Sequence, residues 1–160
     1  MKLHVEIQTA STEPAPDEDD IRSWIAAALA GGARSADSEI CVRLVDSDEM
    51  SKLNRDYRAK EGPTNVLSFP ADLPTELEQP LLGDIVICAP VVRTEAAQQH
   101  KSLRAHWAHM TIHGTLHLLG YDHIEDYQAA AMEALETRIL EQLNFACPYR
   151  DTQAMEQTSG

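Results

Sequence analysis

The stretch HGTLHLLGYDH, residues 113–123, decides both the fold and the chemistry that this chain can carry. It places His113, His117 and His123 at the spacing H-x3-H-x5-H, with Gly120 between the second and third. Histidines four residues apart lie on one face of an α-helix, so both can bind one ion. A glycine can then end the helix in a left-handed turn that presents His123. The pattern predicts a helix with three metal ligands and one open coordination position, which is typical of catalytic zinc sites.

Two further histidines precede this stretch on the same predicted helix. His109 lies one turn before His113, and His106 lies three residues earlier. A row of three histidines along a straight helix cannot surround a single ion. We therefore expect His109 to pack in the interior or to support a ligand, and His106 to be exposed.

Gly114 distinguishes the chain from the zincin metalloproteases. Their H-E-x-x-H string carries a glutamate that serves as general base, and Gly114 occupies that position here. Peptide hydrolysis needs a base that passes a proton to the amine leaving group. The sequence therefore argues against a protease. A bound metal can still activate water, and a phosphodiester, with its better leaving group, suits such a site.

Length and composition indicate one globular domain over residues 1–150 and a disordered tail over 151–160. Hydrophobic residues make up 43% and charged residues 24%, as in soluble proteins. No stretch approaches the roughly 20 apolar residues of a membrane span, and the N-terminus lacks a secretory apolar segment. We expect a cytoplasmic protein that does not contact a membrane. The cysteines Cys41, Cys88 and Cys147 are odd in number and lack a CxxC motif, so we expect reduced thiols rather than zinc ligands.

The charge is unevenly distributed. A net charge of −13 argues against broad, nonspecific binding to nucleic acid. Residues 52–60, however, hold Lys52, Arg55, Arg58 and Lys60 against Asp56. On charge alone this cluster is typical of a solvated helix end, but a local basic patch can also hold one phosphate or a short strand.

Hydrophobic periodicity predicts the order β-α-β-α-β-β-α-α-α. Alternation or apolar runs indicate strands near 3–7, 40–44, 64–69 and 85–89. Helical spacing and end signals indicate helices near 21–29, from 46 or 47 to about 57, from Pro90 onward, over 103–119 with Ser102 as cap, and around 132–143. This order predicts a single α+β domain, with a mixed four-stranded sheet packed with about five helices, one of them the zincin-like metal helix.

Three stretches resemble one known family. They are LNRDYRAKEGPTNVLSFP at 53–70, LLGDIVIC at 81–88 and HWAHMTIHGTLHLLGYDH at 106–123. Together with their spacing they resemble the YbeY-type endoribonucleases, the bacterial rRNA maturation factors, over roughly residues 3–150. The resemblance implies a single-strand-specific, zinc-dependent endoribonuclease that acts at the 3′ end of 16S rRNA and in ribosome quality control.

The resemblance also implies roles for individual residues. It assigns one zinc ion per chain to His113, His117 and His123, and identifies Arg58, with His113, as catalytic. Arg58 can pair bidentately with a phosphate and offset charge in the transition state. Arg55, Lys60 and Ser68 are further expected RNA contacts, although Ser68 also fits an ordinary strand residue. Asp84 either orients a histidine ligand or caps a strand.

The expected partners are single-stranded rRNA and the small ribosomal subunit, reached through a ribosomal protein or a GTPase. Two other functions stay open at the level of sequence. One is a non-catalytic ribosome assembly factor with a structural zinc. The other is a metalloprotease-like amidohydrolase whose base is not recognisable in the sequence.

Overall fold

Four strands and five helices follow one another in the predicted order within the part of the chain that the computed structural model describes, residues 2–71, 80–121 and 125–145. The elements are β1 (Leu3–Thr9), α1 (Glu18–Gly31), β2 (Ser38–Val45), α2 (Ser47–Arg58), β3 (Val66–Pro70), β4 (Leu81–Cys88), α3 (Ala89–Gln98), α4 (Leu103–Leu118) and α5 (Asp126–Gln142). The expected α+β class is confirmed.

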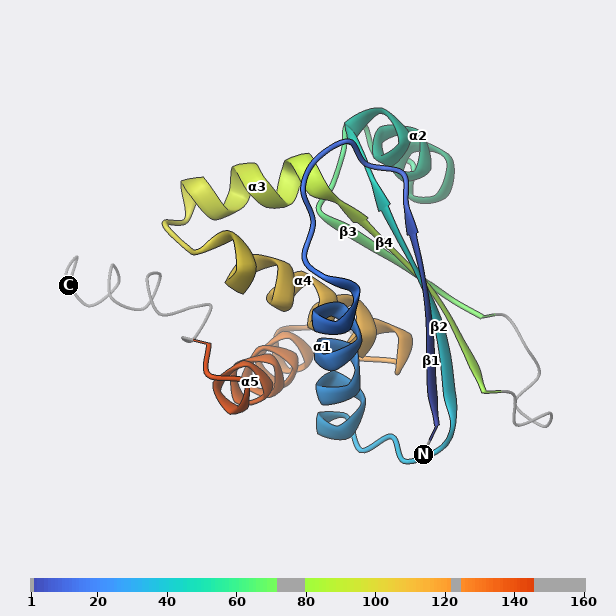
Figure 1. Cartoon of the computed structure of the whole chain (residues 1–160), viewed down its shortest axis with the longest axis vertical. Helices are drawn as coiled ribbons and strands as arrows, with labels where there is room; N and C mark the ends of the chain where they lie inside the picture. The colour runs from blue at the N-terminus through green and yellow to red at the C-terminus, as the bar shows by residue number, and fades with distance from the viewer. Residues whose placement is uncertain (1, 72–79, 122–124, 146–160) are drawn as a thin grey trace.

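The strands form one mixed sheet in the order β1-β2-β4-β3. β1 pairs with β2 and β2 with β4 in parallel, whereas β3 runs antiparallel to β4 along the edge. Figure 1 shows α1, α3, α4 and α5 to one side of the sheet, with α2 at its upper end. The predicted mixed four-stranded sheet is thus confirmed, and its antiparallel edge strand packs against α4, the helix that carries His113 and His117.

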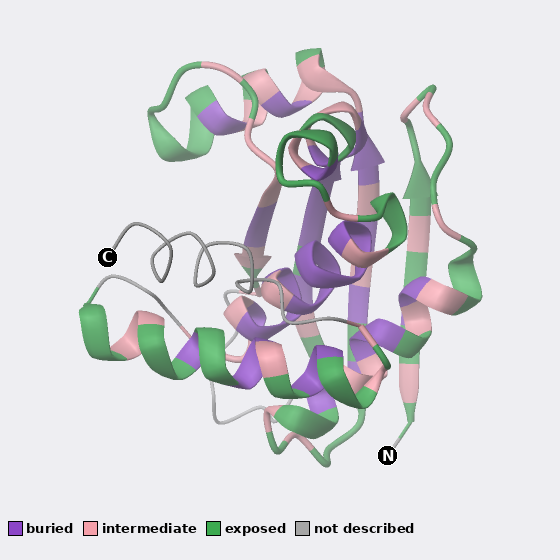
Figure 2. Cartoon of the chain, turned by 90° about the vertical axis from the view of Figure 1, so that its left-hand side faces the viewer, coloured by how far each residue is buried: buried purple, intermediate pink, exposed green. Residues whose placement is uncertain are grey.

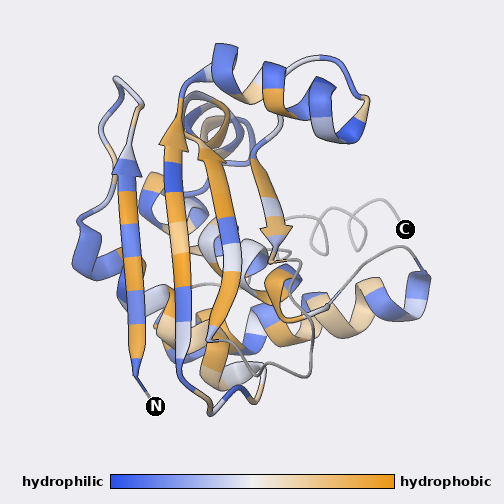
Figure 3. Ribbon diagram, turned by 90° about the vertical axis from the view of Figure 1, so that its right-hand side faces the viewer, coloured by the Kyte–Doolittle hydropathy of each residue, from blue (hydrophilic) through white to orange (hydrophobic). Residues whose placement is uncertain are grey.

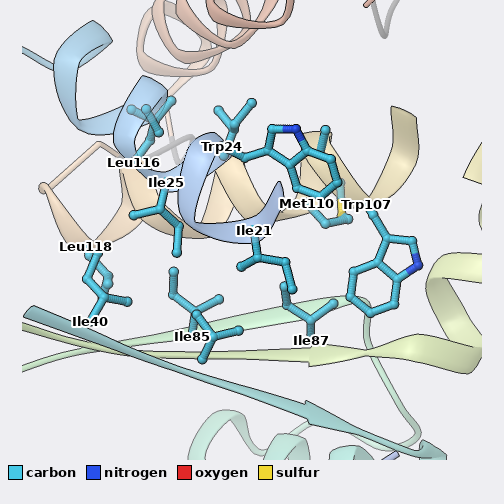
Figure 4. Packing of buried hydrophobic residues seen from close by; sticks show 14 of the residues in the cluster. Ile21, Trp24, Ile25, Ile40, Ile85, Ile87, Trp107, Met110, Leu116 and Leu118 are labelled. Atoms are coloured by element: carbon cyan, nitrogen blue, oxygen red, sulfur yellow. The ribbon is translucent and has the colours of Figure 1, made fainter. Parts of the chain in front are cut away.

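Helix α4 forms the centre of the main core. It packs against α1, α3, α5, β3 and β4, and most of its residues are buried (Figure 2). Figure 4 shows Ile85 and Ile87 of the sheet facing Ile21 and Trp24 of α1 and Trp107 of α4. Burial on this scale contributes about 1.5–3 kcal/mol for each large apolar side chain. The helix that carries the histidines is therefore held on several sides.

A second, smaller core lies between α2 and the opposite face of the sheet. Met50 packs there with Val45, Leu67, Val86 and Cys88. Successive strand residues point to opposite faces, so Val86 belongs to this core and its neighbours Ile85 and Ile87 to the main one. Figure 3 views this side and shows hydrophilic and hydrophobic residues alternating along the strands.

The starts of α4 and α3 match the residues predicted to begin those helices, whereas the start of α2 differs. The Ser102 hydroxyl accepts a hydrogen bond from the backbone N–H of Ala105 at 3.1 Å, as a helix cap should. Pro90 lies in the first turn of α3, also as predicted. Asp46 holds the cap position of α2 but makes no capping bond. Its carboxylate instead accepts hydrogen bonds from Ser11 and Thr12 in the loop after β1.

Two further expectations concern cysteines and membranes. Cys41 and Cys88 are free thiols in strands, as predicted, whereas Cys147 and the tail 151–160 lie outside the described residues. Among the described helices, none combines the length and apolar character needed to cross a bilayer.

Candidate metal and phosphate site

The end of α4 positions the first part of the site. The backbone N–H of Gly120 donates to the carbonyl of His117 and that of Tyr121 to Leu116, at 3.0 and 3.1 Å. Gly120 has φ +99°, in the region that favours glycine. These bonds form a Schellman motif. The predicted left-handed helix end at Gly120 is confirmed, so the chain turns immediately after His117.

His113 and His117 bring two imidazoles together at the wall of a cavity of about 660 Å³. Their Nε2 atoms lie 3.0 Å apart. Two nitrogens bound to one tetrahedral zinc at about 2.0–2.1 Å are separated by about 3.3 Å. The pair therefore needs only a few tenths of an ångström of adjustment to share an ion, and the donor set fits zinc.

A buried carboxylate on α5, Glu136, supports these histidines from behind. It is 1% exposed. Oε2 lies 2.5 Å from Nε2 of His109, and Oε1 lies 3.3 Å from Nδ1 of His113. Burial alone would raise the pKa of Glu136, but the hydrogen bonds from both histidines outweigh it and lower the pKa to about 2. The carboxylate is therefore ionised near neutral pH.

The ionised carboxylate fixes the protonation of the rings around it. A carboxylate can only accept, so the ring nitrogens that face it, Nε2 of His109 and Nδ1 of His113, must carry the hydrogens. Burial lowers the pKa of His109 and keeps that ring neutral. In a neutral His113 the other nitrogen, Nε2, then has its lone pair free toward His117. This carboxylate–histidine pairing is typical of metal ligands in proteins.

The ligand atoms of His109, His113 and Glu136 lie within 4.8 Å of one another, so this group could also hold a metal ion. The 2.5 Å between His109 and Glu136 is shorter than the separation of two donors on one zinc ion, and it fits an N–H···O bond. The expectation that His109 packs in the interior or supports a ligand matches its burial and this bond.

His106 was expected to be exposed, and that expectation is wrong. Its side chain is 2% exposed, and its Nε2 lies 2.9 Å from Glu95 of α3. Glu95 also accepts hydrogen bonds from the Asn65 side chain at 3.1 and 3.2 Å. Because Asn65 lines the cavity, His106 helps to anchor the cavity wall. The sequence shows only a polar residue on the helix, and the buried partner on α3 is not visible in it.

The end of α2 and the residues after it contribute another part of the cavity lining. Arg58 and Lys60 line it and are exposed. The Asn54 side chain donates to the carbonyl of Gly62 at 2.9 Å, which ties the following loop back to the helix. Arg55 is not among the residues that line this cavity, and its guanidinium lies 3.6 Å from Asp56. The cavity therefore brings together the predicted Arg58, Lys60, His113 and His117.

Gly114 is held against the sheet by close packing. A Cβ added there would lie 2.9 Å from Ile85 and 3.2 Å from Val66. The Ser68 hydroxyl donates to the carbonyl of Gly114 at 2.9 Å. Ser68 also lines the cavity, so its expected contact with RNA stays a prediction beside this structural bond. The sequence identified Gly114 only by the missing glutamate, and the structure adds that a side chain there would require the neighbouring side chains of Ile85 and Val66 to shift.

Three other residues complete the comparison with the sequence. His123 lies outside the described residues, so its ligand role stays a prediction. Asp84 borders a hollow together with Cys41 and Val86, on the sheet face away from α4, so it does not orient His113 or His117. Glu136 was missed, yet it follows Leu135 and precedes Ile139 in the apolar stripe of α5. An acid inside such a stripe was the signal that could have found it.

Known proteins are similar to this chain along most of its length. A model of the family "Endoribonuclease YbeY" matches residues 4–144. An endoribonuclease YbeY of Cellvibrio japonicus is 55% identical over 148 residues, covering 92% of this chain and 82% of the relative. One of Pseudomonas putida is 57% identical over 150 residues, covering 93% and 94%. The solution structure of TM1509 from Thermotoga maritima has a TM-score of 0.57 at 24% identity over 92% of each chain, a likeness of fold. By this match along most of its length, the chain belongs to the endoribonuclease YbeY family.

Proposed function

We propose that the protein is a zinc-dependent endoribonuclease that cuts single-stranded RNA, with ribosomal RNA as its substrate. One observation carries the proposal: the paired Nε2 atoms of His113 and His117 share a cavity with Arg58. A metal-binding pair that faces a permanent cation suits an anionic substrate such as a phosphodiester.

His113 and His117 hold the ion in this proposal, with His123 as the third ligand from the sequence. Three histidines with one open position are a typical donor set for catalytic zinc. A zinc ion so bound would acidify a water molecule at neutral pH, and the resulting hydroxide could either attack the phosphorus or remove the proton of a ribose 2′-OH that attacks it. Glu136 keeps Nδ1 of His113 protonated and directs its Nε2 toward the ion.

Arg58 binds and orients the scissile phosphate. Its guanidinium presents a planar fork of donors that matches two phosphate oxygens, and it stabilises the charge that develops on them in the transition state. Lys60, on the same wall, adds a point charge toward the RNA backbone. Gly114 stands where a zincin protease has its glutamate base, and it is closely packed against Ile85, so an amidohydrolase would need a base from another position.

The partners and location follow from charge and composition. A net charge of −13 suits contact with a basic protein better than with naked RNA. We propose that a ribosomal protein of the small subunit, or a GTPase bound there, brings the enzyme to its rRNA in the cytoplasm. The 3′ end of 16S rRNA is the proposed region of cleavage.

The first experiment compares cleavage of single-stranded RNA spanning the 16S 3′ end by zinc-loaded protein and by its His113→Ala and Arg58→Ala variants. Cutting that both variants lose, and that Arg55→Ala retains, supports the proposal. Cutting that persists in both variants contradicts it and indicates a contaminating nuclease. RNA binding without cutting by the parent protein favours a non-catalytic assembly factor instead.

A further inference from the structure

Tyr57, near the end of α2, is a large aromatic side chain that the fold leaves open to solvent. It is 66% exposed. Its ring meets the Phe69 ring of β3 edge to face, with centroids 5.3 Å apart and planes at 71°. The contact with Phe69 limits the motion of the Tyr57 ring and still leaves much of it accessible. The exposed ring therefore offers a flat face on which a nucleic-acid base can stack.

Basic side chains are frequent near Tyr57 in the sequence, although Asp56 is its exposed neighbour and the protein as a whole is acidic. Lys52, Arg55, Arg58 and Lys60 are all exposed within nine residues, on a chain whose net charge is −13. No ion pair with a carboxylate is seen for Arg58 or Lys60 among the residues that the structure describes. Positive charge around an exposed aromatic ring favours a polyanion that also carries flat, apolar groups.

The end of α2 and strand β3 contribute residues to two separate hollows. Arg58 lines the cavity with the histidines, whereas Tyr57 lines a second hollow of about 470 Å³ on the other face of the sheet. Leu53, Phe69 and Val86 give this second hollow apolar walls, and Arg43, Glu49 and Asp84 also line it. Successive residues of an α-helix are rotated by about 100°, which explains why neighbours on α2 face different hollows. Neighbouring residues of β3 point to opposite faces of the sheet, so Ser68 lines the first hollow and Phe69 lines the second.

From this juxtaposition we propose that Tyr57 is a base-stacking subsite for single-stranded RNA whose phosphates are held by Arg58 and Lys60 in the neighbouring cavity. The inference rests on the proposed ribonuclease function. Stacking of a base on an aromatic ring tolerates any sequence, because every base has a π-face. A duplex keeps its bases stacked internally, so such a subsite selects unpaired strands.

The test measures binding rather than cleavage, so that it can fail independently of the catalytic proposal. A short, fluorescently labelled single-stranded RNA is titrated against full-length protein carrying His113→Ala, which prevents cutting. In this background we compare Tyr57→Ala, Tyr57→Trp and Tyr127→Ala. Tyr127 is the matched control, since it is 73% exposed on α5 and lines neither hollow.

We expect Tyr57→Ala to weaken binding by about 5- to 100-fold, and Tyr57→Trp to keep the parent affinity. Tyr127→Ala should leave Kd unchanged. The salt dependence adds a second readout. Tyr57→Ala should keep the slope of log Kd against log salt concentration. Arg58→Ala should reduce that slope by about 1, as expected for the loss of one phosphate contact. Equal melting temperatures would show that the effect of Tyr57→Ala is local.

An abasic scan of the RNA identifies the stacked base. Removing one base at a time should weaken binding strongly at one position, and that loss should disappear in Tyr57→Ala, because the two changes remove the same contact. Three results would overturn the proposal: parent affinity in Tyr57→Ala, equal weakening by Tyr57→Ala and Tyr57→Trp, or no RNA binding by the parent. If Tyr57→Ala binds RNA as tightly as the parent protein, a protein partner becomes the better candidate for binding at Tyr57.

Discussion

Replacing Glu136 with glutamine tests how the metal ligands are held. Glutamine keeps the shape of the side chain, but its amide has one oxygen to accept a hydrogen bond where Glu136 accepts from His109 and His113. The amide NH₂ must then face one ring nitrogen that carries a hydrogen. If His113 relieves this conflict, its proton moves to Nε2, the atom that faces His117.

The expected loss can be estimated from this geometry. Removing a supporting carboxylate behind a histidine ligand lowers metal affinity about 10- to 100-fold, which is about 1.4–2.7 kcal/mol. His117→Ala removes a proposed ligand itself and should release the metal. The assay is competition for zinc with a chelator of known affinity, with Glu133→Gln as the control because Glu133 is exposed one turn away on the same helix.

The same variant should change acid stability in metal-free protein. Folding lowers the pKa of Glu136 from 4.5 to about 2, so its contribution is present above pH about 4.5 and is lost as the pH falls toward 2. The shift corresponds to about 3 kcal/mol, and Glu136→Gln should lack this pH dependence in denaturant unfolding. The reasoning is refuted if His117→Ala keeps one tightly bound zinc while Glu136→Gln releases it, since Glu136 would then be a ligand.

Further predictions concern the packing, the phosphate contact and the buried pair on α3. Gly114→Ala should lower the free energy of unfolding by about 1–3 kcal/mol, because its Cβ would lie 2.9 Å from Ile85; unchanged denaturant midpoints would contradict the close packing. Arg58→Ala should lower kcat about 100-fold, and Arg58→Lys should not restore it because lysine lacks the fork; recovery by lysine would reduce the role to simple charge. Burial raises the pKa of Glu95, but hydrogen bonds from His106 and Asn65 outweigh it and lower the pKa. The contribution of Glu95 to stability is therefore present above its unfolded pKa and is lost in acid. Glu95→Gln should make the free energy of unfolding less dependent on pH below about 4.5. An unaltered pH profile would show that the Glu95–His106 pair is not coupled to folding.

Local patterns predicted most of the fold. The order of strands and helices, the cap at Ser102 and the left-handed Gly120 all follow from spacing within a few residues. The strand order β1-β2-β4-β3 does not, because pairing between distant segments leaves no local periodicity. Likewise, Ile85 and Val86 are both apolar, so the sequence does not show that they belong to different cores. Their assignment depends on which helices pack on each face of the sheet.

The sequence placed together those histidines that lie close along one helix. His113 and His117 meet as the helical spacing requires. Arg58, expected from the resemblance rather than from spacing, lines the same cavity, and its role stays a prediction. Glu136 and Glu95 were not predicted, because each completes a hydrogen bond to a histidine on another helix. The sequence alone does not distinguish a buried glutamate from an exposed one, because burial depends on tertiary packing.

Gly114 also limits how this site can diverge over evolution. A descendant that acquired glutamate there would have to move α4 away from β3 and β4, since even a methyl group meets Ile85 and Val66. Moving the helix would displace His113 and His117 from Arg58 in the same step. A route from this scaffold to a peptidase is therefore expected to disturb the geometry of the older site before a new activity is gained.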